Sequence, residues 1–143
     1  VLFRSDIVMK CGIPLTMCGL DVTHQALVTK PIFAKLDAMG TDLSKTVIGL
    51  LKFFASTYND VFEMPDPPLH DPVAVALLID RSVVKCRKSN VEIELNGTFT
   101  RGATVVDIYN RSGGSTNVDV ALELDFDKFW ALMLDAVEKA GKA

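Results

Sequence analysis

Ile13-Pro14-Leu15-Thr16-Met17-Cys18-Gly19-Leu20 is the stretch of sequence that decides the fold class. It is an apolar run bounded by Gly12 and Asp21, which predicts a strand buried on both faces. The polar residues 21–25 follow it directly. In open α/β sheets, ligands bind where a buried strand of this kind ends, so this junction is a candidate binding edge.

Two helices are predicted after this strand. Thr29 caps the first helix, which has Pro31 in its first turn and ends at Gly40. Thr41 or Asp42 caps the second, whose apolar side chains recur at helical spacing and leave one face for the core. These side chains are Leu43, Val47, Leu50, Leu51, Phe54 and Tyr58.

A proline-rich segment separates these helices from a third one. Residues 59–68 contain three prolines and predict an irregular loop. His70 follows, and Asp71 and Pro72 are a natural cap and a first-turn proline, which predict a helix over residues 73–80.

The last third of the chain predicts strands and a closing helix. Residues 91–95 alternate with period two before the turn signal Asn96-Gly97, and residues 103–109 and 118–124 are two more strand candidates. An amphipathic helix begins at Asp125. A strand, then helices, then a β-rich section and a final helix predict an α/β fold with some antiparallel structure.

The composition excludes several classes of protein. The chain has 143 residues, which suits one domain, and its 49% hydrophobic and 23% charged residues are ordinary for a folded protein. A net charge of −3 argues against nucleic-acid and anionic-membrane partners. No apolar run approaches the roughly 20 residues that span a bilayer. Three cysteines without C-x-x-C spacing indicate reduced thiols in an intracellular, cytoplasmic protein.

The two histidines of the chain are its candidate catalytic groups. His24 follows Asp21 at the end of the predicted strand, and His70 precedes Asp71 at the predicted helix start. On spacing alone, a solvated loop histidine and a plain helix cap are the more common explanations of the same pattern. The sequence lacks the G-x-x-x-x-G-K, H-E-x-x-H and G-x-S-x-G motifs of NTPases, zincins and serine hydrolases.

Four segments occur in one order along the chain: Gly19-Leu20-Asp21-Val22-Thr23-His24-Gln25-Ala26-Leu27, Leu69-His70-Asp71-Pro72-Val73-Ala74-Val75-Ala76, Thr100-Arg101-Gly102-Ala103-Thr104-Val105-Val106-Asp107 and Leu124-Asp125-Phe126-Asp127-Lys128-Phe129-Trp130. Together they resemble the inosine–uridine preferring nucleoside hydrolase family, over residues 11–141. The resemblance implies the C-terminal part of an open, mostly parallel, Rossmann-like sheet with flanking helices and some antiparallel strands.

The resemblance also implies a chemistry. Members of this family hydrolyse the N-glycosidic bond of ribonucleosides in nucleoside salvage, giving ribose and a free base, and they use a bound calcium ion. By the family's H-D-P motif, Asp71 is expected to be a calcium ligand and His70 to protonate the leaving base. Calcium prefers oxygen ligands, and imidazole is a suitable acid near neutral pH.

Two aromatic residues are expected on the substrate side. Tyr58 lies where some family members have a tyrosine on an active-site helix, and Phe54 lies where another tyrosine can stand, so a hydroxyl role is lost there. For residues 21–24 the resemblance supplies no ligand role, and a structural one is expected. The resemblance leaves base preference open and implies a homo-oligomer, a dimer or tetramer.

The chain departs from the family pattern on its N-terminal side. The D-x-D-x-G-x-D-D cluster, which supplies most calcium ligands in the family, is not in this sequence. Residues 1–5 resemble a translated sequencing adapter, so we expect a non-native leader there and the C-terminal part of a hydrolase domain over residues 6–143. Such a fragment is expected to be inactive alone.

Two other classes of function stay open at this point. The first is a non-catalytic α/β module, such as a pseudoenzyme or an assembly subunit. The second is an HD-type phosphohydrolase, suggested by His70-Asp71. It is disfavoured because it needs further histidines to hold its metals, and His24 is the only other one.

Overall fold

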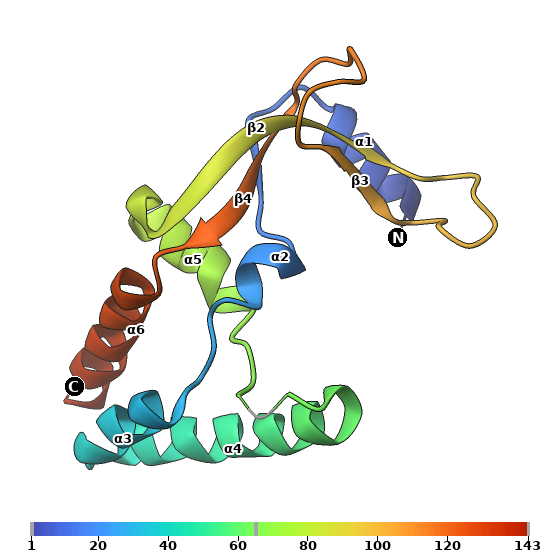
Figure 1. Cartoon of the computed structure of the whole chain (residues 1–143). Helices are drawn as coiled ribbons and strands as arrows, with labels where there is room; N and C mark the ends of the chain where they lie inside the picture. The colour runs from blue at the N-terminus through green and yellow to red at the C-terminus, as the bar shows by residue number, and fades with distance from the viewer. Residues whose placement is uncertain (1, 65, 143) are drawn as a thin grey trace. The chain divides into compact units, whose positions relative to one another are not determined.

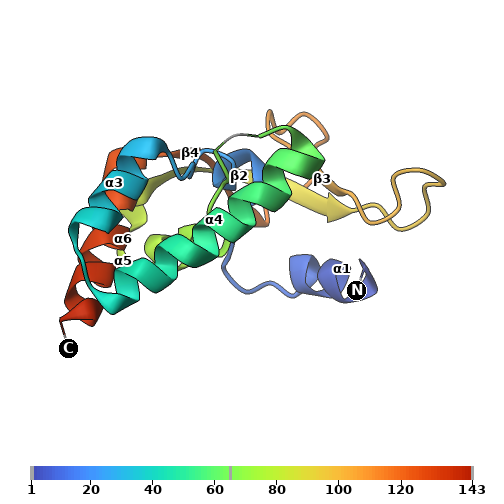
Figure 2. The same ribbon diagram turned by 90° about the horizontal axis from the view of Figure 1, so that it is seen from below.

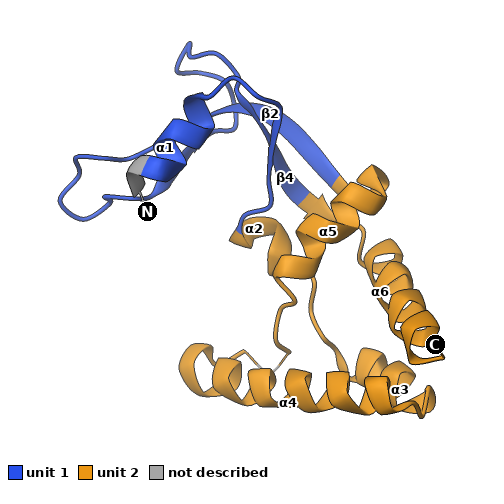
Figure 3. Cartoon of the chain, turned by 180° about the vertical axis from the view of Figure 1, so that it is seen from behind, with its two compact units in different colours: residues 1–19, 85–122 blue, residues 20–84, 123–143 orange. Residues whose placement is uncertain are grey.

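A computed structural model describes residues 2–64 and 66–142, with side chains described from Arg4 onward. The chain forms two compact units, which Figure 3 shows in different colours. Unit 1 comprises residues 1–19 and 85–122, and unit 2 comprises residues 20–84 and 123–143. The chain therefore passes between the units three times.

Unit 1 contains nearly all of a mixed four-stranded sheet and the helix α1 (Leu2–Lys10). The strands are β1 (Leu15–Met17), β2 (Val84–Ile93), β3 (Thr104–Asp107) and β4 (Val118–Leu124). Figure 1 labels this helix and the strands β2, β3 and β4. The strand order is β1-β4-β2-β3. Strands β1 and β4 are parallel, and β2 and β3 are antiparallel. The predicted α/β class with added antiparallel structure is confirmed.

The core of unit 1 lies on the two inner strands. Val118 and Val120 of β4 and Val91 of β2 are buried, and Leu15 and Met17 of β1 pack against them. The predicted strand is confirmed only over Leu15–Met17, three of its eight residues. The prediction that it is buried on both faces was wrong, because β1 is an edge strand whose residues are half-buried. Helix α1 and the first seven residues of β2 were not predicted.

Unit 2 is helical. Its elements are α2 (Leu20–Thr23), α3 (Lys30–Ala38), α4 (Asp42–Phe62), α5 (Asp71–Ile79), the short 3-10 helix η1 (Arg81–Val83) and α6 (Phe126–Gly141). Helices α3 and α6 both contact α4 (Figure 2). The largest buried side chains of this unit include Leu36 and Phe129. Within residues 2–64 and 66–142, no helix combines the length and the apolar character that crossing a membrane requires.

The predicted starts of two helices are confirmed, and the N-cap side chain at each start accepts a hydrogen bond from the helix. The Ser44 amide donates to Thr41 Oγ1 over 3.1 Å at the start of α4. The Lys128 amide donates to Asp125 Oδ1, also over 3.1 Å, at the start of α6. Each bond satisfies an amide that has no partner within its helix.

Helix α4 is longer than predicted. It continues to Phe62 and ends at Glu63, which adopts a left-handed conformation with φ 54° and donates its amide to Asn59 O. The predicted loop over residues 59–68 was therefore wrong for its first four residues. The physical reason is that no proline interrupts the helix before residue 65, while Phe62 continues the apolar spacing of Phe54 and Tyr58.

The start of α5 also differs from its prediction. His70 occupies the N-cap position, without a side-chain capping bond, and Asp71 is the first helical residue. Asp71 was predicted to be the cap, which is wrong. Its carboxylate is instead exposed in the first turn, where the helix dipole stabilises a negative charge.

Candidate functional site

The segment before His70 is fixed against the segment after α2, both in unit 2. Val28 donates its amide to Pro67 O, and Leu69 donates its amide to Ala26 O, each over 2.9 Å. Pro67 is fully buried. This irregular segment therefore has a defined position, and it places the backbone of His70 next to α2.

Both ring nitrogens of His70 have a hydroxyl partner. Thr23 Oγ1, from α2, lies 2.8 Å from Nδ1. The Tyr58 hydroxyl, from α4, lies 2.6 Å from Nε2. The imidazole is thus held from two sides, by residues 47 and 12 positions away in the sequence.

Aromatic rings surround this bonded group. Phe54 and Tyr58, one turn apart on α4, have centroids 4.6 Å apart, and the Phe54 ring meets that of His70 edge-on at 6.5 Å. The His24 ring lies 5.5 Å from that of His70. We use the name His70 cluster for Thr23, His24, Phe54, Tyr58 and His70. The structure therefore brings together three of the four residues predicted for the site.

Burial lowers the pKa of His70, and the nearby His24 lowers it further, while the Asp71 carboxylate acts in the opposite direction. Burial disfavours the charged form of an imidazole, so the ring is mainly neutral at neutral pH. A neutral imidazole has one N–H donor and one acceptor nitrogen. Hydroxyls can donate or accept, so Thr23 and Tyr58 are suitable partners for either nitrogen.

The arrangement can move a proton. Tyr58 and His70 are half-buried, so their bonded atoms are neither fully solvated nor closed off within the core. A hydroxyl hydrogen-bonded to an imidazole can pass on its own proton while it takes one from the ring nitrogen. The His70 cluster is therefore suited to general acid–base chemistry.

Asp71, the predicted metal ligand, does not form a metal site with the other residues that the structure describes. Among the described residues, no three His, Cys, Asp or Glu side chains gather closely enough to hold a metal ion. Calcium takes about six to eight oxygen ligands, and one exposed carboxylate does not supply them. The described part of the chain therefore does not fit a complete calcium site.

Sequence reasoning missed the contacts of Thr23 and His24 with His70. Both were expected to be structural residues at a strand end, and they lie instead in and beside α2. The available signal was that a threonine and a histidine follow the predicted buried strand directly. Their partner is far along the chain, so local patterns did not identify it.

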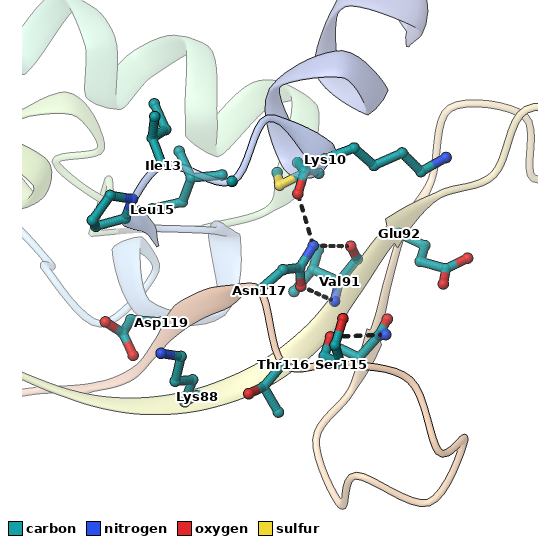
Figure 4. A pocket seen from close by; sticks show the side chains of 14 residues that line it. Lys10, Ile13, Leu15, Lys88, Val91, Glu92, Ser115, Thr116, Asn117 and Asp119 are labelled. Carbon is teal, nitrogen blue, oxygen red and sulfur yellow. Dashed lines mark hydrogen bonds between the residues drawn. The ribbon is translucent and has the colours of Figure 1, made fainter.

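A separate cavity of about 610 Å³ lies in unit 1. Its lining comes from α1, β1, β2 and residues 115–119. Figure 4 shows the Asn117 amide group hydrogen-bonded to the Val91 backbone. The same group also donates to Met9 O over 2.9 Å. This amide joins α1 to β2, so its hydrogen-bonding capacity is used by the fold.

Three comparisons with known proteins agree. The profile of a family described as inosine-uridine preferring nucleoside hydrolase matches residues 5–131. A probable ribonucleoside hydrolase of Dictyostelium discoideum is 38% identical over 140 residues, which cover 94% of this chain and 41% of that protein. An inosine-uridine preferring nucleoside hydrolase of Crithidia fasciculata is 40% identical over 127 residues, which cover 89% of this chain and 40% of that protein.

Solved structures show the same similarity. A purine-preferring ribonucleoside hydrolase from Gardnerella vaginalis is similar with a TM-score of 0.82 and 28% identity, over 96% of this chain and 43% of that one. A plant nucleoside hydrolase has a TM-score of 0.79 at 22% identity, over 94% of this chain and 44% of that one, and supports the fold alone. The chain spans about 40% of the length of the curated relatives described above.

Proposed function

Because the chain belongs to the inosine-uridine preferring nucleoside hydrolase family, we propose that the full-length protein hydrolyses the N-glycosidic bond of ribonucleosides to ribose and a free base. The observation that supports this most directly is the double hydrogen bonding of His70, to Thr23 and to Tyr58. Cleavage leaves negative charge on the departing base, so a positioned acid accelerates it.

The proposed proton path uses two residues of this chain. When His70 is protonated, its Nε2–H donates to the Tyr58 oxygen, so the phenolic O–H is free to donate to the departing base. As the C–N bond breaks, the phenolic proton moves to the base, and the Nε2 proton replaces it on the phenol. His70 ends neutral, and its lowered pKa makes its cation a stronger acid, though a less populated one.

Phe54 and Tyr58 are proposed to lie on the base side of the substrate. Their rings are half-buried neighbours on one face of α4, and such rings can stack on the flat face of a nucleobase. Phe54 provides an apolar surface without a hydroxyl, so any direct hydrogen bond from this helix to the base comes from Tyr58.

Asp71 is proposed to supply one carboxylate to a calcium site that residues outside this chain complete. A bound calcium ion would orient the ribose hydroxyls and lower the pKa of a bound water. The exposed position of Asp71 leaves its carboxylate free to face such a site. Its neighbour His70 points instead toward Thr23 and Tyr58.

The proposal is tested by incubating the purified full-length protein with inosine, uridine and other ribonucleosides and measuring release of reducing sugar and free base. We expect both products in equal amounts, with loss of activity in the presence of a chelator. A correctly folded full-length protein that releases no base from any ribonucleoside would contradict the proposal and favour the non-catalytic α/β module.

A further inference from the structure

We propose that Thr23 is a positioning residue, whose hydroxyl holds the His70 ring in the one orientation that presents Nε2 to Tyr58. This inference rests on the proposed function and extends it to a residue outside the H-D-P motif. Thr23 does not contact the reacting atoms itself. It acts on the reaction only through His70.

The backbone around Thr23 and His70 fixes the distance between them. Thr23 is the last residue of α2, and three residues later Ala26 O accepts the Leu69 amide. Val28 binds Pro67 in the same way, so the two segments form a short antiparallel contact. The 2.8 Å contact between Thr23 and His70 is therefore set by the fold, and it does not depend on a mobile loop.

Burial makes this hydrogen bond necessary for the threonine. Thr23 is only 4% exposed, and its neighbour Val22 is fully buried. A buried hydroxyl without a partner costs free energy, so an orientation of the His70 ring that keeps the partner is favoured. If Thr23 had a purely structural role, a backbone carbonyl could accept the hydrogen bond of its hydroxyl equally well.

The ring of a histidine has two orientations that differ by a half-turn about its Cβ–Cγ bond, and this torsion is soft. A half-turn places the ring carbon Cδ2 where Nδ1 was and the ring carbon Cε1 where Nε2 was. The aromatic contacts with Phe54 and His24 do not distinguish the two orientations, because a flipped ring occupies the same plane. The Thr23 hydroxyl does distinguish them, because only one orientation offers it a nitrogen.

The same bond selects the tautomer that the proton path needs. If Thr23 Oγ1 accepts from Nδ1–H, the neutral ring has its lone pair on Nε2, facing the Tyr58 hydroxyl. Nδ1–H can donate to Thr23 before and after the proton moves, so the bond persists throughout the reaction. A site that does not reorganise during the reaction stabilises the transition state more effectively.

The test compares two substitutions in the full-length protein, Thr23→Val and Thr23→Ser. Valine keeps nearly the shape of threonine and removes the hydroxyl, whereas serine keeps the hydroxyl. For inosine we expect Thr23→Val to lower kcat by about tenfold with KM little changed, because one hydrogen bond is lost. Thr23→Ser should restore most of this loss, and nitrophenyl riboside, whose leaving group needs no proton, should be cleaved equally by all three proteins.

A second measurement does not depend on catalysis. Nitrogen NMR of the His70 side chain should show mainly the Nδ1–H tautomer in the parent protein and in Thr23→Ser, and a mixture of tautomers in Thr23→Val. The inference is overturned if Thr23→Val keeps the parent kcat on inosine, if Thr23→Ser loses as much as Thr23→Val, or if the tautomer is the same in all three proteins. If the protein hydrolyses no nucleoside, the proposed function fails, and the NMR result still decides the role of Thr23.

Discussion

At the residue scale, Tyr58 determines whether His70 can act on anything beyond its own cluster. Its hydroxyl lies 2.6 Å from Nε2, and the opposite nitrogen of the ring is bonded to the buried Thr23. A proton that leaves the imidazole toward a ligand therefore has the phenol in its path. The family resemblance indicated Tyr58 and His70 as site residues, but it did not indicate Thr23, whose contact with His70 joins residues 47 positions apart in the sequence.

Tyr58→Phe tests this path in the full-length protein. The substitution keeps the ring that packs on Phe54 and removes only the hydroxyl. We expect kcat on inosine to fall by roughly 10²-fold, as for loss of a general acid, with a small change in thermal stability. Tyr109→Phe is the matched control, because Tyr109 is 77% exposed and lies outside the His70 cluster. Equal kinetics of Tyr58→Phe and Tyr109→Phe would contradict the proposed path.

Asp71→Asn tests the proposed calcium ligand. The change removes one negative charge at an exposed first-turn position with little change in shape. We expect calcium to bind the full-length protein more weakly by at least about tenfold, measured by isothermal titration. Asp127→Asn is the matched control, because it changes an exposed aspartate in the first turn of α6. Full calcium affinity in Asp71→Asn would remove this residue from the metal site.

At the scale of elements, local signals predicted the starts of helices better than their ends. Thr41 was identifiable as a candidate cap and Asp125 as a helix start, and in both cases the short side chain bonds an amide three residues later. The end of α4 was not predicted correctly, because Asn59 and Asp60 are residue types common in loops, although the helix continues through them. The start of β2 was hidden because its solvent-facing side chains include Lys85, Arg87 and Lys88, a run that resembles a loop.

Asp107, at the end of β3, gives a prediction about pH. Hydrogen bonds from the Ser112 and Arg111 amides lower its pKa from 3.8 to about 2. The unfolded chain therefore binds this proton more readily, so the stabilisation is complete above pH 3.8 and is lost as the pH falls toward 2. We expect Asp107→Asn to melt below the parent protein at pH 7 and the difference between the two melting temperatures to shrink as the pH falls from 3.8 to about 2. A difference in melting temperature that is independent of pH would contradict this.

At the scale of the whole molecule, the order of motifs predicted the family and the α/β class, and the comparisons confirm both. What the chain alone does not supply is a complete site. Its relatives are more than twice as long, and the described residues contain one exposed carboxylate of the proposed metal site and no cluster around it. The packing around helix α5 is also incomplete. Its sequence is apolar on every face, yet Leu78 is 83% exposed.

We propose that His70 governs protonation of the leaving base, and the rates of the His70→Ala variant on two substrates test this role. His70→Ala in the full-length protein should slow hydrolysis of inosine by roughly 10²- to 10⁴-fold, because the departing base loses its acid. Hydrolysis of nitrophenyl riboside should change little, because nitrophenolate leaves without a proton. Equal losses on the two substrates would contradict the claim, since they would show that His70 supports the fold or the ribose site and does not act on the leaving group.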